Sequence, residues 1–293
     1  MASNELTLDT AGVASDDTPE ATRRLSAGVK ASLYLLCAYV AIALFSPLLV
    51  GDYTTINTGQ RLQPPGVEHW FGTDHLGREI FARSLVGTRT SLMVGVTVAA
   101  FATVFGVLIG LYAGFFRMAD RIVMGLMDGL MAIPGVLLAI ALASLLGGNL
   151  ITLIVAITVP EIPRMARLTR SVVLSLREQS FVVAAVSIGT STPKILFRHI
   201  LPNAVGTLSV QATYVGAAAI LTESVLSFLG VGIPPEVPSW GNIMAVGRQY
   251  FQLAPWIVGF PGLFLCLLVL AVNLLGDSLR DRLDPRTNIR SDL

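Results

Sequence analysis

The sequence predicts an all-α polytopic membrane protein. Of its 293 residues, 53% are hydrophobic and only 13% are charged, against roughly 25% charged in an average soluble domain. The mean hydropathy is +0.70. Several stretches are apolar and long enough to cross a bilayer, which takes about 20 helical residues. Because so few polar side chains cannot cover this much apolar surface in water, we expect the chain to face lipid.

Six transmembrane helices are expected in a membrane domain that spans 29–285. Before it, residues 1–28 have no apolar core and several acidic side chains, which predicts a disordered cytoplasmic tail. After it, 286–293 is expected to be a cytoplasmic C-terminal tail. The fourth span is the weakest because it is short and closes on Pro160 and Pro163. The expected spans are 29–50, 92–116, 122–146, 148–163, 207–229 and 256–277.

The positive charges favour six spans with both termini in the cytoplasm. Lys and Arg in short segments that flank a span are retained in the cytoplasm. On this topology, all but five of the 20 Lys and Arg residues lie on one side, and the five are Arg61, Arg78, Arg83, Arg89 and Arg248. A five-span chain would place its C-terminus outside. The net charge of +1 gives no reason to expect nucleic acid as a partner. The apolar composition predicts contact with membrane lipid.

The first long loop, 51–91, is expected outside. Its end, GREIFARSLVG, has apolar and charged residues on opposite helical faces, with Arg83 on the charged face, which predicts an interfacial helix before the second span. The loop also contains His69, Asp74 and His75. Histidines near an aromatic residue at a membrane surface usually have structural roles, so we expect no metal site.

A second long segment, 164–206, is expected in the cytoplasm. Arg164, Arg167 and Arg170 recur every three residues and predict a basic helical stripe. The stripe either continues the fourth span into water, lines a contact between subunits, or faces phospholipid head groups.

A short helix is expected within this segment, over 181–188. Small residues, Ala184 and Ala185, lie at its centre and permit close approach of a partner. It should stop at Gly189, which suits the left-handed position that ends many helices.

A second short helix should follow directly. Ser191 or Thr192 can cap it, with Pro193 at its first position, and it is expected to end near Pro202 and Asn203. Two short helices across a tight turn form a rigid protrusion, which can fit a groove in a cytosolic partner and transmit rigid-body motion.

This pattern resembles the EAA loop of binding-protein-dependent ABC importer permeases. That motif has two alanines, a glycine four residues after the second, and Leu-Pro twelve and thirteen residues after the glycine. The matching residues are Ala184, Ala185, Gly189, Leu201 and Pro202. The chain departs from the motif at Val183, which replaces a glutamate, and at His199, which replaces an isoleucine. The resemblance assigns the matching residues, with Phe181 and Val183, to coupling with ATPase subunits.

Four further stretches, in order, resemble the second permease of the dipeptide/oligopeptide/nickel group. They are 69–95, 120–142, 221–244 and 272–285. The resemblance implies the type I ABC importer permease fold, in a bacterial or archaeal plasma (inner) membrane. It implies a heterodimer with a second homologous permease, two ATP-binding subunits and an extracytoplasmic substrate-binding protein. Each permease would form half of the path for di- or oligopeptides, with nickel or glutathione as alternative substrates.

The chain has no sequence motif for hydrolysing ATP. It lacks a GxxxxGK[ST] loop, and its only lysines are Lys30 and Lys194. We therefore expect a transport subunit with no catalytic residue and no cofactor of its own, and ATP and Mg bound by partner subunits.

Two acidic residues, Asp128 and Glu223, lie deep in expected spans and are candidates for the pathway, because burying a charge there costs several kcal/mol. The segment Leu226–Trp240 contains three prolines and two glycines, which predicts a rigid re-entrant turn outside. With Ser227 and Trp240 it would form part of an external gate. We expect the third, fifth and sixth spans to line the path.

Two other interpretations of these acids stay open. Glu223 could simply tie its span to a neighbour. An ion-coupled secondary carrier or an intramembrane hydrolase could also use a pair of acids, although the sequence has no GxSG or HExxH motif.

Overall fold

The computed structural model describes residues 27–51 and 53–283. The two tails expected at 1–28 and 286–293 lie outside this part of the chain, apart from residues 27 and 28, which begin the first helix. The described residues form helices and loops without a named strand, and only Thr73 and Glu79 form an isolated β-bridge. The all-α prediction is therefore confirmed.

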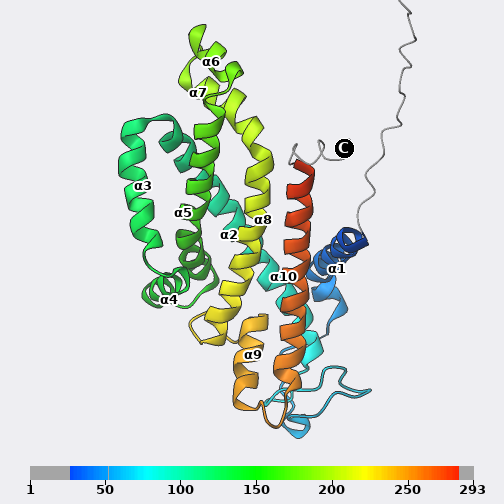
Figure 1. The fold of residues 1–293 in the computed structure, drawn as a ribbon. Helices are drawn as coiled ribbons and strands as arrows, with labels where there is room; N and C mark the ends of the chain where they lie inside the picture. Colours follow the sequence, from blue (N-terminus) through cyan, green and yellow to red (C-terminus); the bar gives the residue numbers. More distant parts are fainter. Residues whose placement is uncertain (1–26, 52, 284–293) are drawn as a thin grey trace, which may run out of the picture.

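Ten α-helices and two short segments of other helical type make up the described chain (Figure 1). They are α1 (Ala27–Leu49), the 3-10 turn η1 (Thr58–Gln60), α2 (Ile80–Phe115), α3 (Arg117–Met131), α4 (Gly135–Leu146), α5 (Leu150–Leu176), α6 (Ser180–Ser187), α7 (Thr192–Lys194), the π-helical segment η2 (Ile195–Ile200), α8 (Leu201–Phe228), α9 (Trp240–Gln249) and α10 (Trp256–Leu283).

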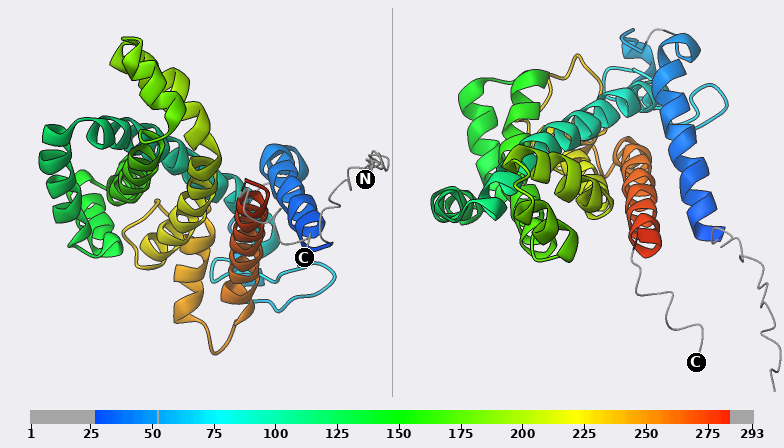
Figure 2. Two further views of the ribbon diagram at one scale, coloured as in Figure 1. Left: turned by 45° about the horizontal axis from the view of Figure 1, so that its top comes forward. Right: turned by 90° about the horizontal axis from the view of Figure 1, so that it is seen from above.

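The long helix α2 is the centre of the bundle. It packs most extensively against α5 and then against α8, while α10 packs against α8 and α1. Glycines permit the close α2–α5 contact, because a Cβ at Gly106 would lie 2.5 Å from the Cβ of Met165, and one at Gly110 would lie 2.5 Å from the backbone oxygen of Ala166. Figure 2 shows α1 beside α10, at the edge of the molecule away from α3 and α4.

Four described helices are long and apolar enough to span a bilayer, and a bent pair raises the number to five. The four are Gly28–Leu48, Ile80–Phe115, Thr192–Phe228 and Trp256–Asp281, which contain or overlap the expected first, second, fifth and sixth spans. The expected third span is the pair α3 and α4, which is bent by 86°. Pro134 lies at this bend, as the residue before α4.

The expected fourth span falls in α5, which is not among the helices that qualify as spans by length and composition. This helix carries Glu161 and a series of arginines in its second half. It nevertheless runs beside α2 and α8 between the same two ends of the bundle (Figure 1). The count of six spans stays a prediction that rests on α5.

The prediction of a separate interfacial helix before the second span is wrong. One uninterrupted helix of 36 residues begins at Ile80. Both Ile80 and Arg83 are buried in it, so the charged face expected at Arg83 does not point to solvent. These first turns are part of α2 and pack inside the protein, on α9 and on the loop 51–79 between α1 and α2, which we call the outer loop.

Candidate functional site

The two short helices expected to couple to a partner lie at one extreme end of the molecule. Figure 1 shows α6 and α7 beyond the ends of α5 and α8, at the opposite end of the molecule from α9. The helix α5 leads into α6, and η2 continues into α8. The protrusion is therefore continuous with two helices of the bundle core.

Gly189 ends α6 in the way the sequence predicts. Its φ is +77°, in the left-handed region. The N–H of Thr190 donates to the carbonyl of Ala185 at 3.0 Å, and the N–H of Gly189 donates to that of Val186 at 2.9 Å. These bonds satisfy carbonyls at the end of the helix. A Cβ at Gly189 would meet no atom, so its backbone conformation, and not crowding, requires glycine here.

The helix α6 has one buried and one exposed apolar face. Val182 and Ala185 are buried with Leu111 of α2 and Ile195 and Ile200 of η2. On the other face, large apolar side chains are exposed, although this end of the chain carries many charges. They are Phe181, Val183, Val186 and Ile188, with Ala184 also exposed between them. An apolar face on a projecting rigid element is typical of a protein-binding surface.

The second helix of the loop does not end near Pro202, contrary to expectation. It continues through the π-helical segment η2 into α8, without interruption from Thr192 to Phe228. Pro202 has no N–H to donate, and its ring would clash with a carbonyl of the preceding α-helical turn. A π-helical turn relieves this conflict, and the Asn203 side chain donates to the His199 carbonyl at 2.7 Å.

The helix caps differ from expectation in the same region. Ser191 is the N-cap of α7, but its side chain makes no capping hydrogen bond. Pro193 lies at the second position of the helix, one residue after the expected first position. Of the residues that match the EAA motif, Leu201 is half-buried and Pro202 is exposed at the start of α8.

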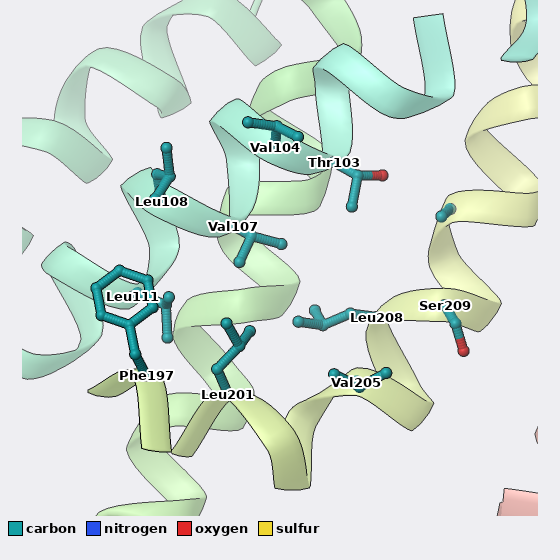
Figure 3. Close-up of a pocket in the computed structure, with 11 residues that line it drawn as sticks. Thr103, Val104, Val107, Leu108, Leu111, Phe197, Leu201, Val205, Leu208 and Ser209 are labelled. Atoms are coloured by element: carbon teal, nitrogen blue, oxygen red, sulfur yellow. The ribbon is translucent and has the colours of Figure 1, made fainter. Parts of the chain in front are cut away.

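An apolar cavity of about 480 Å³ opens beside the protrusion, between α2 and the η2–α8 segment (Figure 3). Leu111 and Val107 line it from α2, and Phe197, Leu201 and Val205 line it from the other side. Phe197 is exposed. This cavity extends the apolar surface of the protrusion toward the membrane-spanning part of the bundle.

The arginine stripe of α5 binds a neighbouring helix. Arg170 forms a two-point ion pair with Asp120 of α3, with 2.7 Å between Nη2 and Oδ2, and Arg167 pairs with Asp128 of α3 at 2.6 Å. Arg164 pairs with Glu161 within α5 at 3.1 Å. Asp128, a candidate for the pathway, therefore lies in a solvent-accessible α3–α5 contact that the sequence pattern did not reveal.

The other candidates for the gate, Glu223, Ser227 and Trp240, come together where α8 meets α9. The Glu223 side chain is fully buried. Its carboxylate accepts hydrogen bonds from Ser227 at 2.8 Å, from Ser91 of α2 at 3.3 Å and from Ser224 at 3.4 Å. Ser227 also accepts from the N–H of Ile233 at 3.3 Å, which links this cluster to the loop after α8.

Trp240 anchors the start of α9. Its side chain is fully buried, and its Nε1 donates to the Ser84 carbonyl of α2 at 3.0 Å. Its ring packs edge-on against Tyr39 and near Phe264, which joins α9 to α1 and α10. Ser239 caps α9 by accepting from the N–H of Asn242. The segment Leu226–Trp240 is thus tied to α1, α2 and α10.

The outer loop folds back on itself around Asp74. This carboxylate accepts from the N–H groups of Leu76 and Arg78 and pairs with Arg78 Nε at 2.7 Å. The His75 ring stacks on Tyr250, and burial lowers the pKa of His75 below its ordinary value. Among the described residues, no cluster of three or more His, Cys, Asp or Glu side chains has the arrangement of a metal site.

The side chain of Arg83 is buried, whereas helical periodicity predicts that it lies on an exposed, charged face. It is 3% exposed, and its Nη2 donates to the Pro235 carbonyl at 3.3 Å. The ion pairs of the described residues do not include it. Helical periodicity could not reveal this, because the loop that covers Arg83 comes from a segment about 150 residues later in the chain.

Comparison with known proteins identifies relatives over most of the chain. The model of the family described as binding-protein-dependent transport system inner membrane component matches residues 102–289. A probable peptide ABC transporter permease of Sinorhizobium fredii is 51% identical over 256 residues, which is 87% of this chain and 88% of the relative. A dipeptide transport system permease of Alkalihalophilus pseudofirmus is 43% identical over 256 residues, covering 87% of this chain and 84% of the relative.

A solved structure has the same fold. The chain is similar to one from the MetNI methionine ABC transporter in an inward-facing conformation, with a TM-score of 0.57 and 20% sequence identity. The similarity covers 68% of this chain and 94% of the other. The fold is therefore that of a type I importer permease.

Proposed function

The chain belongs to the family of binding-protein-dependent transport system inner membrane components, and from this we propose that it forms half of a peptide path in an ATP-driven importer. It would pair with a second homologous permease in the plasma (inner) membrane. Two ATP-binding subunits would supply ATP hydrolysis, with ATP and Mg bound there, and an extracytoplasmic binding protein would deliver the substrate.

The observation that carries the proposal is the exposed apolar face of α6 on a rigid protrusion. Phe181, Val183 and Ile188 are exposed there, while Val182 and Ala185 fix α6 to α2 and η2. A partner that buries the exposed face can move the protrusion as one body, and α5 and α8 carry this motion into the bundle. This arrangement supports coupling to a cytosolic subunit although Val183 replaces the usual glutamate.

The structure separates two alanines that the sequence motif treats alike. Ala184 is exposed and Ala185 is buried in the α6–η2 contact. Ala184→Glu should leave the fold intact and place an unpaired charge in the subunit interface, so co-purification of the ATP-binding subunits and peptide uptake should fall about tenfold or more. Ala185→Glu should instead lower the melting temperature of the permease itself, since it buries the charge within the chain.

Met118→Glu is the matched control, because Met118 is 71% exposed near the start of α3, outside the protrusion. It should behave as wild type in both measurements. Normal co-purification and uptake in Ala184→Glu would contradict coupling through this face.

Peptide is the substrate we propose, which the peptide and dipeptide permeases among the relatives support. Uptake of labelled dipeptides and longer peptides should be lost in a deletion strain and restored by this chain with its partner subunits. Nickel and glutathione uptake are the competing assays. Loss of either of these with peptide uptake intact would reassign the substrate within the same family.

A further inference from the structure

A cavity of about 490 Å³ lies at the α8–α9 corner, and it shares Ser227 with the Glu223 cluster. The end of α8, the loop that follows it and α9 form most of the wall, and Gly148 of the α4–α5 turn and His75 of the outer loop complete it. Its volume is within the range of pockets that hold small molecules. The polar groups at its lining come from Ser227, Asn242, Arg248 and Gln249 in addition to His75.

The charge of this cavity has one sign. Arg248 and His75 are the ionisable residues that line it, and the lining includes no Asp or Glu. The Arg248 guanidinium carbon lies 5.4 Å from the centre of the Phe228 ring, another lining residue, which holds the cation at the wall. Within the described part of the chain, no salt bridge involves Arg248.

A second cation lies directly behind the wall. Arg83 is buried, and it donates to the carbonyl of Pro235, which lines the cavity. A buried guanidinium is normally paired with a carboxylate, because an isolated buried charge is costly. The carboxylate partner is absent among the described residues of this chain. Neither arginine has a carboxylate within salt-bridge distance among the described residues, and Asp74, which acts on Arg83 at longer range, is itself paired with Arg78. The arginines on the two sides of this cavity wall therefore give it an excess of positive charge that an incoming anion would balance.

We propose that this cavity binds the terminal carboxylate of the peptide as it enters the path, with Arg248 in contact and Arg83 as the positioning residue behind Pro235. This inference rests on the proposed peptide function. Guanidinium and carboxylate groups form two-point, charge-assisted hydrogen bonds, which are among the stronger ones in proteins. The cavity lies against Leu226–Trp240, so a bound carboxylate would contact the segment we assign to the external gate.

The first test uses the complete transporter in proteoliposomes with its loaded binding protein. Initial uptake rates are compared for one labelled peptide with a free C-terminus and for the same peptide with a C-terminal amide. The ratio of the two rates is taken within each preparation, so incomplete folding lowers both rates and leaves the ratio unchanged. The binding protein is the same throughout, so its own preference cancels between variants.

In Arg248→Gln the ratio of free-acid to amide uptake should fall about tenfold, the scale of one hydrogen bond to a charged group. Arg248→Lys should keep part of the preference. Glu68→Gln, on the exposed outer loop away from the cavity, is the control and should keep the wild-type ratio. An unchanged ratio in Arg248→Gln would overturn the proposal. This holds whether or not both rates fall together, since an equal fall leaves the ratio unchanged.

A second measurement needs no binding protein. Ala245 lines the cavity and is half-buried, so Ala245→Cys, with Cys37 and Cys266 replaced by Ser, places a reporter in its wall. In the purified complex, the free-acid peptide should slow maleimide labelling of this cysteine and the amidated peptide should not. Val67→Cys, at 96% exposure on the outer loop, is the control that neither peptide should protect.

Equal protection by both peptides, or protection by neither, would overturn the carboxylate site. Failure of the site and failure of the proposed function are distinguishable. If the wild-type complex takes up neither peptide, the peptide function itself is wrong, whereas uptake of both peptides without dependence on Arg248 removes only this inference.

Discussion

Among single residues, Glu223 accepts hydrogen bonds from serines on α2 and α8, at the corner where α8 ends and the loop before α9 begins. Ser91 comes from α2, and Ser224 and Ser227 come from α8 itself. The carboxylate is fully buried, and it contacts the gate segment through Ser227, which accepts from the Ile233 N–H, and through Ser239, the cap of α9. We therefore propose that Glu223 acts on the gate as a positioning residue.

Glu223→Gln should assemble normally, because an amide can accept from Ser227 while the other hydroxyls turn to accept from its NH2 group. Glu223→Leu removes the acceptor of the surrounding buried serine hydroxyls, and should destabilise the permease by about 1–3 kcal/mol more than the Gln variant. Thermal unfolding of the purified complex measures the difference. Thr222→Val is the control, since Thr222 on the same helix bonds only to the Ala218 carbonyl.

Equal stability of the Leu and Gln variants would contradict the hydrogen-bonded role. Measurements of transport test whether the charge of Glu223 has a role in the pathway. Unchanged uptake kinetics in a stable Glu223→Gln complex would remove a charged role in the pathway, whereas altered uptake would support one.

At the scale of elements, the contact between α3 and α5 depends on pairs of opposite charge. The acidic residues Asp120 and Asp128 are two helical turns apart on α3, and Arg170 and Arg167 face them from α5, which runs in the opposite direction. The contact places α3, and the sharp bend that follows it, against the helix that leads into the coupling protrusion.

A double-mutant cycle with Asp120→Asn and Arg170→Gln should give a coupling free energy of about 0.5–1 kcal/mol, since the pair is two-pronged and partly shielded. The cycle with Asp128→Asn and Arg167→Gln should give less, because its side chains are 62% and 50% exposed, against 25% and 32% in the first pair. Melting temperatures of the four variants of each cycle provide the values.

Arg117→Gln, at the exposed start of α3, is the control for loss of one positive charge. A larger coupling energy for the more exposed pair would show that shielding does not set the strength of these contacts.

At the scale of the whole molecule, the topology follows from which end of the bundle each loop occupies. The outer loop and α9 lie at one end, and the α2–α3 turn and the coupling protrusion lie toward the other (Figure 1). Six spans require α5 to cross the bilayer despite Glu161 and its arginines. Those arginines have ion-pair partners on α3 or within α5, which lowers the cost of that crossing.

Single cysteines test this arrangement in a background with Cys37 and Cys266 replaced by Ser. Thr55→Cys should react with an impermeant maleimide in intact cells. Met118→Cys should react only after the membrane is opened, since both positions are exposed on the protein and only the bilayer separates them. Reaction of both cysteines in intact cells would refute the proposed topology.

Sequence alone was sufficient for the fold class and for the first of the two short helices of the protrusion. Apolar composition and the length of apolar stretches determine that the chain is a helical membrane protein, because only a lipid solvent suits so much apolar surface. Local chemistry was also sufficient at Gly189, where a helix end that needs positive φ selects glycine.

Only the tertiary structure decided which side chains face inward and which residues meet. Periodicity placed Arg83 outside, but the loop around Pro235 covers it. The same holds for Asp128, which pairs with Arg167, and for Ala184 and Ala185, which differ only in what packs on them. Such contacts join residues far apart in the chain, and the energy of burying a charge or a methyl group depends on the atoms that surround it, which no local pattern records.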